Sequence, residues 1–405
     1  MKEIELNVRQ KNAVKADEPK ILCLASAASG KALPNSVKIP TTTGWKIVGE
    51  IKVGDYLYDR YGKPTQVLQI FPQGSLDVYE ITFGDGRKAL CSKDHIWIVN
   101  KNTWKNKNDY REYTVEEMLK EELVDSNRRA KFYIPCSLAI EKPEKEYSIH
   151  PYIIGAFLGD GCCKEHQLTI SSNDKEIPNK IATLLGNNIS AYKLPSENYS
   201  WTFHYNDKNE TKIYTSILPK ELLNYSYDKS IPEEYKNGSI EQRLMLLQGL
   251  FDTDGSISKD GRADHAATAT VKFTSTSKKL IDDVKEVLGS LGYVSSIKID
   301  DRKDKYSQGI CYELLVNMLN SDKYKLFSLQ RKKEIALMVK DKKQQKRYDR
   351  TSIRSIEKLN YKEEMTCFLV DNQEHTFLMN DYLVTHNTRT LTERIKFLIL
   401  HRNVK

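Results

Sequence analysis

The chain has 405 residues, of which 39% are hydrophobic and 29% are charged, and its formal net charge is +8. This composition is typical of a soluble globular protein with two or three domains. It excludes a helical membrane protein, because no stretch approaches the roughly 18 apolar residues of a membrane span. The N-terminus also lacks the apolar core of a signal peptide, so we expect a cytoplasmic protein. The mild positive charge permits nucleic-acid binding without requiring it.

The seven cysteines are scattered and form no repeated Cys-x-x-Cys pair, which argues against structural zinc. Disulfides are also disfavoured in a reducing compartment. We interpret the adjacent Cys162 and Cys163 as packing residues rather than reactive ones.

A phosphate-binding loop is divided between the two ends of the chain. Residues 25–31 read Ala-Ser-Ala-Ala-Ser-Gly-Lys, but the Ser or Thr that should follow and bind magnesium is missing. A suitable residue occurs at Thr388, at the start of an amphipathic helical segment. Joining Lys31 to Thr388 restores an ordinary loop that runs into its helix. We therefore interpret residues 32–387 as an insertion.

The pattern of apolar and turn-forming residues changes twice within the insertion. From residue 32 to about 140, glycine-containing turns separate short alternating runs, which predicts an all-β region. From about 148 to 340, longer helical runs are mixed with strands. The stretch 330–350 is rich in Lys, Arg and Gln, so we predict an exposed connector there and consider it for DNA contact. Residues 351–387 resume the β pattern, which indicates a discontinuous β domain with a mixed domain inserted into it.

His386 and Asn387 stand immediately before Thr388, at the point where the phosphate loop would be repaired. An asparagine amide can attack its own main-chain carbonyl, which closes a succinimide and breaks the bond to the next residue. The adjacent histidine can act as general acid, and the threonine hydroxyl can accept an acyl group. Such a tripeptide is common by chance, but its position here favours a self-excising insertion.

Four segments occur in order in the insertion: Leu33 to Asp55, Ser92 to His95, Cys367 to Phe377, and Asn380 to Asn387. They resemble the sequence blocks of the intein splicing domain, with Ser92 where the family usually has Thr. The resemblance implies a multidomain chain. Its all-β Hint domain would be discontinuous, and an α+β domain would be inserted into it. The implied boundaries are 1–31 for the N-terminal flank, 32–140 and 346–387 for the splicing domain, 141–345 for the inserted domain, and 388–405 for the C-terminal flank.

Inteins ordinarily begin with Cys or Ser, but this position is Ala32. Ala32 is either an engineered replacement or a mark of the class 3 inteins, which naturally lack that nucleophile. Class 3 carries a Trp after the second-block His, a Cys in the penultimate block and a Thr before the terminal His-Asn. Trp97, Cys367 and Thr385 occupy those three places, which favours the natural class. Taken alone, Trp97 would be a core aromatic and Cys367 a buried structural thiol.

The resemblance implies how the first bond is broken. The thiolate of Cys367 would attack the carbonyl of Lys31 and release the amine of Ala32. His95 would protonate the departing nitrogen, and Ser92 would position either that nitrogen or the strained amide.

The resemblance also implies the later steps. Thr388 would take over the acyl group, and Asn387 would cyclise with help from His386. His375 is assigned either an assisting role or a structural one, and Trp97 and Thr385 would shape the pocket without reacting. Splicing would need no cofactor.

Two segments of the inserted region are similar to each other. Residues 151–161 and 246–255 each form an apolar run with small residues and end in Asp-Gly, at Asp160 and Asp254. A carboxylate at a helix C-terminus is disfavoured by the helix dipole, and a shared divalent cation would compensate for it. The plainer alternative is a pair of core helices with incidental Asp-Gly ends.

The paired segments resemble the motifs of LAGLIDADG homing endonucleases, with a following strand and helix at residues 267–292. The resemblance implies Asp160 and Asp254 as ligands of Mg²⁺ or a similar divalent cation. It also implies double-stranded DNA at the intein-free host gene as the partner, cut by a monomer. The auxiliary lysines of the family are not assigned from the sequence, and whether the nuclease is active stays open.

Residues 6–31 and 388–405 resemble the nucleotide site of a superfamily 1 DNA helicase, which implies short α/β flanks. Gln10 would contact adenine, Gly30 and Lys31 the phosphates, and Thr388 the magnesium ion after joining. These flanks are too short for a helicase, so ATP would be bound only by the full-length spliced host. Two rival interpretations stay open: a homing endonuclease on a splicing-inactive scaffold blocked at Ala32, and a nucleotide-binding protein with an inert insertion.

Overall fold

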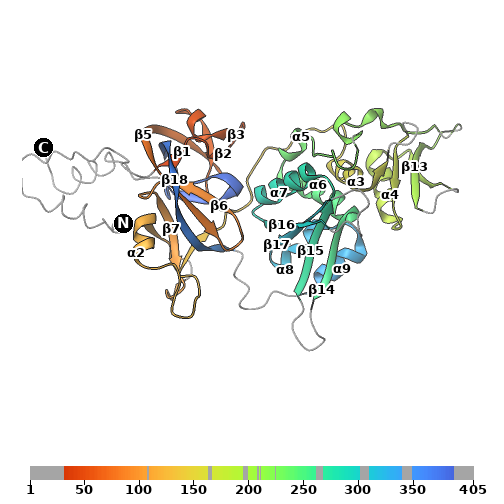
Figure 1. Ribbon diagram of the computed structural model, residues 1–405. Helices are drawn as coiled ribbons and strands as arrows, with labels where there is room; N and C mark the ends of the chain where they lie inside the picture. The colour runs from red at the N-terminus through yellow and green to blue at the C-terminus, as the bar shows by residue number, and fades with distance from the viewer. Residues whose placement is uncertain are drawn as a thin grey trace, which may run out of the picture.

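The computed structural model describes residues 32–386, with gaps at 107–108, 163–166, 195–198, 208, 210, 224, 261–267, 302–309 and 340–348. The predicted host residues Gln10, Gly30 and Lys31 therefore lie outside the described part of the chain, as do the junction residues Asn387 and Thr388. The described residues form two bodies that lie side by side (Figure 1). One body is built mainly of strands, and the other combines helices with two sheets.

The first body is dominated by a ten-stranded sheet. Eight strands follow the order β3-β2-β4-β5-β18-β9-β7-β8, while β1 pairs with β18 and β6 pairs with β5. The bounds of these strands are β1 Leu33–Pro34, β2 Lys38–Thr41, β3 Gly44–Ile47, β4 Tyr56–Tyr58, β5 Pro64–Phe83, β6 Lys88–Cys91, β7 Ile96–Lys101, β8 Arg111–Thr114, β9 Phe132–Pro135 and β18 Arg350–Val370. A short helix, α2 (Val115–Lys120), and a hairpin of β19 (Thr376–Leu378) and β20 (Val384–His386) complete the body.

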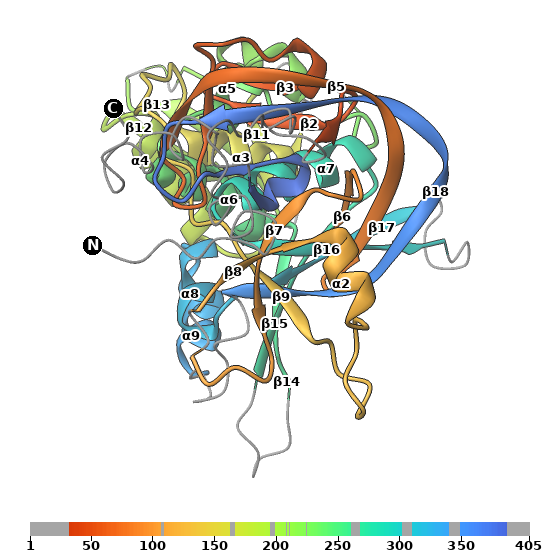
Figure 2. The ribbon, with the colours of Figure 1, turned by 90° about the vertical axis from the view of Figure 1, so that its left-hand side faces the viewer.

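The longest pairing in this body joins distant parts of the sequence. Strand β18 runs antiparallel to β5, from Ile353 opposite Phe83 to Val370 opposite Val67. Figure 2 shows the two strands following one long curve. The inward side chains of both strands contribute to one core, in which Trp97 is completely buried. The β patterns predicted before residue 140 and after residue 351 therefore meet in a single sheet.

The second body consists of two halves with the same layout. The first half has a four-stranded sheet of order β10-β11-β13-β12, and the second has one of order β14-β15-β17-β16. The strand bounds are β10 Gly161–Cys162, β11 Thr169–Ser171, β12 Ile189–Lys193, β13 Ser200–Tyr205, β14 Gly255–Asp260, β15 Thr268–Ser275, β16 Val294–Asp300 and β17 Cys311–Asn317. The helices are α3 Pro151–Asp160, α4 Glu176–Leu185, α5 Glu233–Lys236, α6 Ile240–Thr253, α7 Lys278–Ser290, α8 Asn320–Lys323 and α9 Gln330–Leu337.

Helices α3 and α6 join the halves through glycine contacts. A Cβ atom added to Gly155 would lie 2.0 Å from the carbonyl oxygen of Leu246, and one added to Gly249 would lie 2.2 Å from that of Tyr152. No residue with a side chain fits at either position without moving the other helix. The glycines of these two segments thus let α3 and α6 pack at close range.

The prediction of an exposed connector over 330–350 is wrong for its first part. Residues 330–337 form α9, and the side chain of Lys332 is only 5% exposed. The sequence is misleading here because the lysine ammonium is buried against main-chain carbonyl oxygens, which a count of charged residues does not reveal. Residues 340–348 lie outside the described part of the chain.

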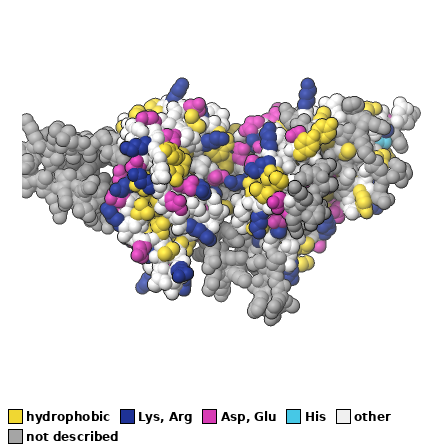
Figure 3. All heavy atoms as spheres, viewed as in Figure 1, with side chains coloured by type: hydrophobic (Ala, Val, Ile, Leu, Met, Phe, Trp, Pro, Cys, Tyr) yellow, Lys and Arg dark blue, Asp and Glu magenta, His cyan; other side chains and the backbone are white. Residues whose placement is uncertain are grey.

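No helix within the described residues is both long enough and apolar enough to cross a membrane. On the face shown in Figure 3, basic and acidic side chains are interspersed over both bodies.

Candidate functional site

Ala32 is held against Ser92 by two hydrogen bonds. The amide nitrogen of Ala32 donates to Ser92 Oγ over 3.2 Å, and the amide of Ser92 donates to the carbonyl oxygen of Ala32 over 3.0 Å. Ala32 is completely buried. Its amide nitrogen belongs to the Lys31–Ala32 bond, so the Ser92 hydroxyl lies directly on the atom that would leave if this bond were broken.

Cys367 follows the part of β18 that pairs with β1. Strands β1 and β18 pair antiparallel, with Leu33 opposite Thr366 and Pro34 opposite Met365. Continuing this register by one residue sets Ala32 opposite Cys367. Opposed residues of an antiparallel pair have Cα atoms about 4.5–5.5 Å apart and side chains on the same face. Cys367 is 3% exposed, so its thiol is shielded from solvent, one residue along β18 from the partner of Leu33.

His95 belongs to a small buried cluster next to this position. Its amide donates to the carbonyl oxygen of Ser92 over 3.2 Å, which closes the turn that carries both residues. Its Nε2 atom shares a hydrogen bond of 2.7 Å with Thr385 Oγ1. The ring of Trp97 meets the imidazole edge-on, with centroids 5.5 Å apart. The structure therefore brings Trp97, His95 and Thr385 together, although they come from opposite ends of the sequence.

The β19–β20 hairpin carries the last described residue, His386. Thr376 lies opposite His386 in the hairpin, so His375 is one step away, and the two imidazole centroids are 6.3 Å apart. His386 Nε2 is 3.7 Å from the Glu112 carboxylate, and His386 is buried. Two histidines thus adjoin the main chain that continues to Asn387.

The surroundings of Cys91 make it an unreactive thiol. Burial raises the pKa of Cys91 to about 12, although the neighbouring side chain of Trp97 opposes the shift. The thiolate is the nucleophilic form of cysteine, so Cys91 stays inert at neutral pH. Trp97 thus contacts both this thiol and the ring of His95.

The second body brings Asp160 and Asp254 together at the ends of its two central helices. Asp160 is the last residue of α3, and Asp254 caps α6. A Cβ atom at Gly159 would lie 3.4 Å from Asp254 Oδ2, so this carboxylate reaches the opposite helix. Burial raises the pKa of both carboxyl groups, and the negative charge of Asp160 adds to the shift at Asp254, whose pKa is about 7.

Two lysines that the sequence did not single out accompany these carboxylates. Lys229 Nζ donates to the carbonyl oxygen of Gly159 over 2.9 Å. Lys332 Nζ donates to the carbonyl oxygens of Phe251, Asp252 and Gly255 over 2.6–2.8 Å, and burial lowers its pKa to about 8. Each lysine comes from the later part of the same half as its carboxylate, and each favours the ionised carboxylate. The sequence feature that could have pointed to these lysines is the two-fold repeat, because it predicts that the two halves place similar residues at equivalent positions.

The donor set at Asp160 and Asp254 fits a hard divalent cation. Two close carboxylates offer oxygen ligands and repel each other, and a cation between them removes that repulsion. Within the described residues, no group of three or more His, Cys, Asp or Glu is arranged to hold a metal ion. The remaining ligands would therefore be main-chain carbonyls, water or a substrate phosphate.

Comparison with known protein families gives one match within the second body. Residues 241–326 match the model of the LAGLIDADG-like domain. This range contains Asp254 and most of the second half, and it begins within α6.

Among curated proteins, the replicative DNA helicase DnaB of Mycobacterium intracellulare is 28% identical over 91% of this chain and 60% of its own length. The DnaB helicase of Mycobacterium leprae is 35% identical over 19% of this chain and 13% of its own length. The chain thus spans at most about 60% of these relatives.

Among solved structures, the gp41-1 intein is 28% identical, with a TM-score of 0.20 over 26% of this chain and 75% of its own. The homing endonuclease I-DmoI in complex with DNA and calcium is 15% identical, with a TM-score of 0.30 over 47% of this chain and 96% of its own. The chain is therefore similar to a LAGLIDADG-like domain over residues 241–326 and to a DnaB-type helicase along most of its length.

Proposed function

We propose that the chain is a class 3 intein precursor that splices itself and carries a homing endonuclease. Two observations near Ala32 support this proposal. The β1–β18 register, continued by one residue, would set Cys367 opposite Ala32, and Ser92 Oγ accepts a hydrogen bond from the Ala32 amide nitrogen. The pairing of β18 with β5 supports a discontinuous splicing domain of residues 32–140 and 346–387.

In the proposed first step, the Cys367 sulfur forms a bond to the carbonyl carbon of Lys31. The Lys31–Ala32 bond breaks, and the nitrogen of Ala32 takes up a proton and leaves as an amine. Ser92 holds that nitrogen, and the imidazole of His95 supplies the proton directly or through Ser92. The product is a thioester that joins residues 1–31 to Cys367.

In the proposed later steps, the Thr388 oxygen forms a bond to the same carbonyl carbon and the Cys367 sulfur leaves as a thiol. The side-chain nitrogen of Asn387 then attacks its own carbonyl carbon, which breaks the bond to Thr388 and frees the insertion as a succinimide. His386 assists by protonating the leaving nitrogen, and His375 stands next to it. A final shift of the acyl group from oxygen to nitrogen leaves a peptide bond. Each step exchanges one acyl linkage for another, so no cofactor is consumed.

The rival in which Ala32 blocks a nucleophile at its own position gives no role to the buried thiol of Cys367. Under that rival, Cys367, Trp97 and Thr385 would be ordinary core residues. The class 3 proposal gives a chemical role to Cys367 and a reason for the Trp97–His95–Thr385 contacts.

We also propose that the second body cuts double-stranded DNA at the intein-free host gene as a monomer. The LAGLIDADG-like match over 241–326 and the paired Asp160 and Asp254 support this second activity. Both carboxylates would hold Mg²⁺, which would polarise the scissile phosphate and stabilise the charge that develops on it. The positive charges of Lys229 and Lys332 favour the ionised form of both carboxylates.

For the host, we propose a DNA helicase whose phosphate loop is restored when Lys31 joins Thr388. The similarity to a DnaB-type helicase supports a helicase host. DnaB helicases belong to superfamily 4, whereas the flanking motifs resemble superfamily 1, so the proposal is limited to a P-loop helicase.

The thioester on Cys367 gives the sharpest test of the proposed first step. An Asn387→Ala, Thr388→Ala variant has neither acyl acceptor nor cyclising residue, so the thioester should accumulate. Hydroxylamine should then release residues 1–31 as a hydroxamate, detected by mass spectrometry. Adding Cys367→Ala should abolish the release. If hydroxylamine releases nothing from the double variant, or if the release persists without Cys367, the proposed nucleophile is wrong.

A further inference from the structure

The turn before β20 has an unusual backbone. Two consecutive residues, Asp381 and Tyr382, have left-handed φ values of 52° and 56°. This conformation is unfavourable for a non-glycine residue and persists only where the surroundings hold it. The turn, η7 (Asn380–Tyr382), connects β19 to β20 and lies four residues before His386. The contacts that hold the turn therefore help to set the position of β20.

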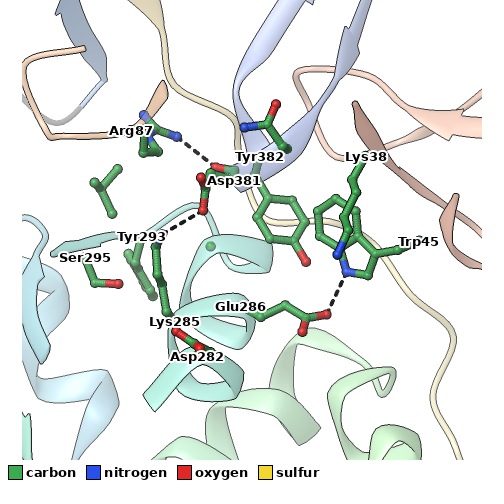
Figure 4. Close-up of a pocket in the computed structure, with 13 residues that line it drawn as sticks. Lys38, Trp45, Arg87, Asp282, Lys285, Glu286, Tyr293, Ser295, Asp381 and Tyr382 are labelled. Atoms are coloured by element: carbon green, nitrogen blue, oxygen red, sulfur yellow. Dashed lines mark hydrogen bonds and ion pairs between the residues drawn. The ribbon is translucent and has the colours of Figure 1, made fainter. Parts of the chain in front are cut away.

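Both bodies supply contacts to this turn. From the first body, Arg87 donates to the carbonyl oxygen of Asp381 over 3.1 Å, and the Asn380 side-chain amide donates to the carbonyl oxygen of Lys88 over 2.8 Å. From helix α7 of the second body, Lys285 Nζ lies 2.8 Å from the Asp381 carboxylate. Figure 4 shows Arg87 and Lys285 reaching Asp381 from different elements. Contacts from both the first and the second body therefore hold the turn.

The ring of Tyr382 forms the apolar part of the same junction. The residue is 4% exposed, and Trp45 meets its ring edge-on with centroids 5.3 Å apart. On the other side the ring rests on α7 at Gly289, where an added Cβ atom would lie 2.6 Å from Tyr382 Cδ2. Trp45 Nε1 also donates to the Glu286 carboxylate of α7 over 2.8 Å, as Figure 4 shows. Glycine at position 289 is what lets Tyr382 lie this close to the helix.

We propose that α7 of the second body is a positioning element for the C-terminal step of splicing. Through Lys285 and Gly289 it holds the strained turn, and the turn sets β20 with His386 and the Asn387 that follows. This inference rests on the proposed splicing function and adds a residue-level dependence of that function on the inserted domain. The groups proposed for the N-terminal step, Ser92, His95 and Cys367, lie outside β20, and His95 is joined to this strand through Thr385. The N-terminal step should therefore depend on α7 less strongly than the C-terminal step.

The first test is Gly289→Ala in the full chain. Alanine is a better helix former than glycine, so α7 should keep its helix. The new Cβ atom would displace the Tyr382 ring and the turn with it. We expect the bond between Asn387 and Thr388 to break at least tenfold more slowly, so that the branched intermediate accumulates. The N-terminal step should slow by a much smaller factor, transmitted through the contact between Thr385 and His95. The matched control is Lys279→Ala, an exposed residue on the same helix, which should splice as wild type.

The second test is a charge exchange across the junction. Because the Lys285–Asp381 pair is about one-third exposed, Lys285→Glu should slow the C-terminal step by only about two- to fivefold. Adding Asp381→Lys should restore the rate, which a purely destructive change would not allow. Both steps are followed by intact mass against time.

The outcomes distinguish a failure of the positioning role of α7 from a failure of the splicing proposal. If wild type and Lys279→Ala both fail to break either junction, the splicing proposal fails and this inference fails with it. If wild type splices and Gly289→Ala breaks both junctions at the control rate, only this inference is overturned. It is also overturned if Gly289→Ala slows both junctions equally or if Asp381→Lys does not rescue Lys285→Glu.

Discussion

Leu33 lies opposite Thr366 in the β1–β18 pair, and the next residues along the two strands are Ala32 and Cys367. Both residues are buried, and Cys367 belongs to the strand that forms the longest pairing of the sheet. This relationship would let a chain with alanine at the first position of its insertion attack the bond before it, as the proposed first step requires.

Ser92 and His95 should control the first step. Ser92→Ala removes the oxygen that accepts the Ala32 amide hydrogen, and His95→Ala removes the proposed proton donor. General acid catalysis typically contributes about 10²–10⁴-fold, so thioester formation in His95→Ala should fall by at least about 100-fold. The rate is measured as hydroxylamine-released residues 1–31 in the Asn387→Ala, Thr388→Ala background.

Two further variants control this prediction. Ser92→Thr keeps the hydroxyl and should retain most of the rate, whereas Ser36→Ala changes an exposed serine and should have no effect. Equal rates in His95→Ala and Ser36→Ala would remove His95 from the proposed mechanism.

Asp254 should make the stability of the second body depend on pH. Its pKa is about 7 in the folded chain against an ordinary value of 3.8, so the folded state binds this proton more tightly than the unfolded state. The stabilisation from the protonated form is complete below pH 3.8 and is lost as the pH rises through about 7. The full loss is at most on the order of 4 kcal/mol.

Asp254→Asn should therefore be more stable than its parent at pH 8 in excess chelator, and the difference should shrink towards pH 5. Thermal unfolding in a Cys367→Ala, Asn387→Ala background keeps the chain intact during the measurement. Magnesium should stabilise the parent more at pH 8 than at pH 5 and should not stabilise Asp254→Asn to the same extent. A parent and variant of equal stability at pH 8 would contradict the buried carboxylate pair.

DNA cleavage should require both helix-terminal carboxylates. Asp160→Asn and Asp254→Asn each remove one charge from the pair with almost no change in volume. Each variant should lose at least about 100-fold of the magnesium-dependent cutting of intein-free host DNA, because charge stabilisation at a phosphate depends on the held cation. Asp282→Asn, half-exposed on α7, is the matched control. If a variant with both Asp160→Asn and Asp254→Asn cut DNA at the control rate, this pair of carboxylates would be excluded as the metal site.

The contact between α3 and α6 should tolerate no side chain. Gly155→Ala places a Cβ atom 2.0 Å from the carbonyl oxygen of Leu246, so the helices must separate. We expect a loss of about 2–3 kcal/mol in the free energy of unfolding, measured with denaturant. Gly86→Ala, at a φ of 88° with no atom within 4 Å, should cost only about 1 kcal/mol. Equal losses in the two variants would contradict the close packing of the helices.

The sequence predicted the arrangement of strands and helices where local patterns were strong. The alternating runs before residue 140, the two glycine-containing helices and the strand and helix within 267–292 all have counterparts in the structure. The sequence wrongly predicted an exposed position for Lys332. This lysine is buried because it donates hydrogen bonds to carbonyl oxygens of α6, which is far away in the sequence. The sequence also did not predict that Tyr382 would rest on Gly289, because this contact depends on how the two bodies dock. Contacts between distant elements leave no periodic signal.

The most direct measurement of the central claim is the intact mass of the freshly expressed chain over time, with and without Cys367. Wild type should yield two products: free residues 32–387, and residues 1–31 joined to 388–405. Cys367→Ala should keep the Lys31–Ala32 bond intact and yield no joined product. Splicing by Cys367→Ala would contradict the account. So would an intact wild type accompanied by splicing of Ala32→Cys, because the attacking group would then belong to position 32.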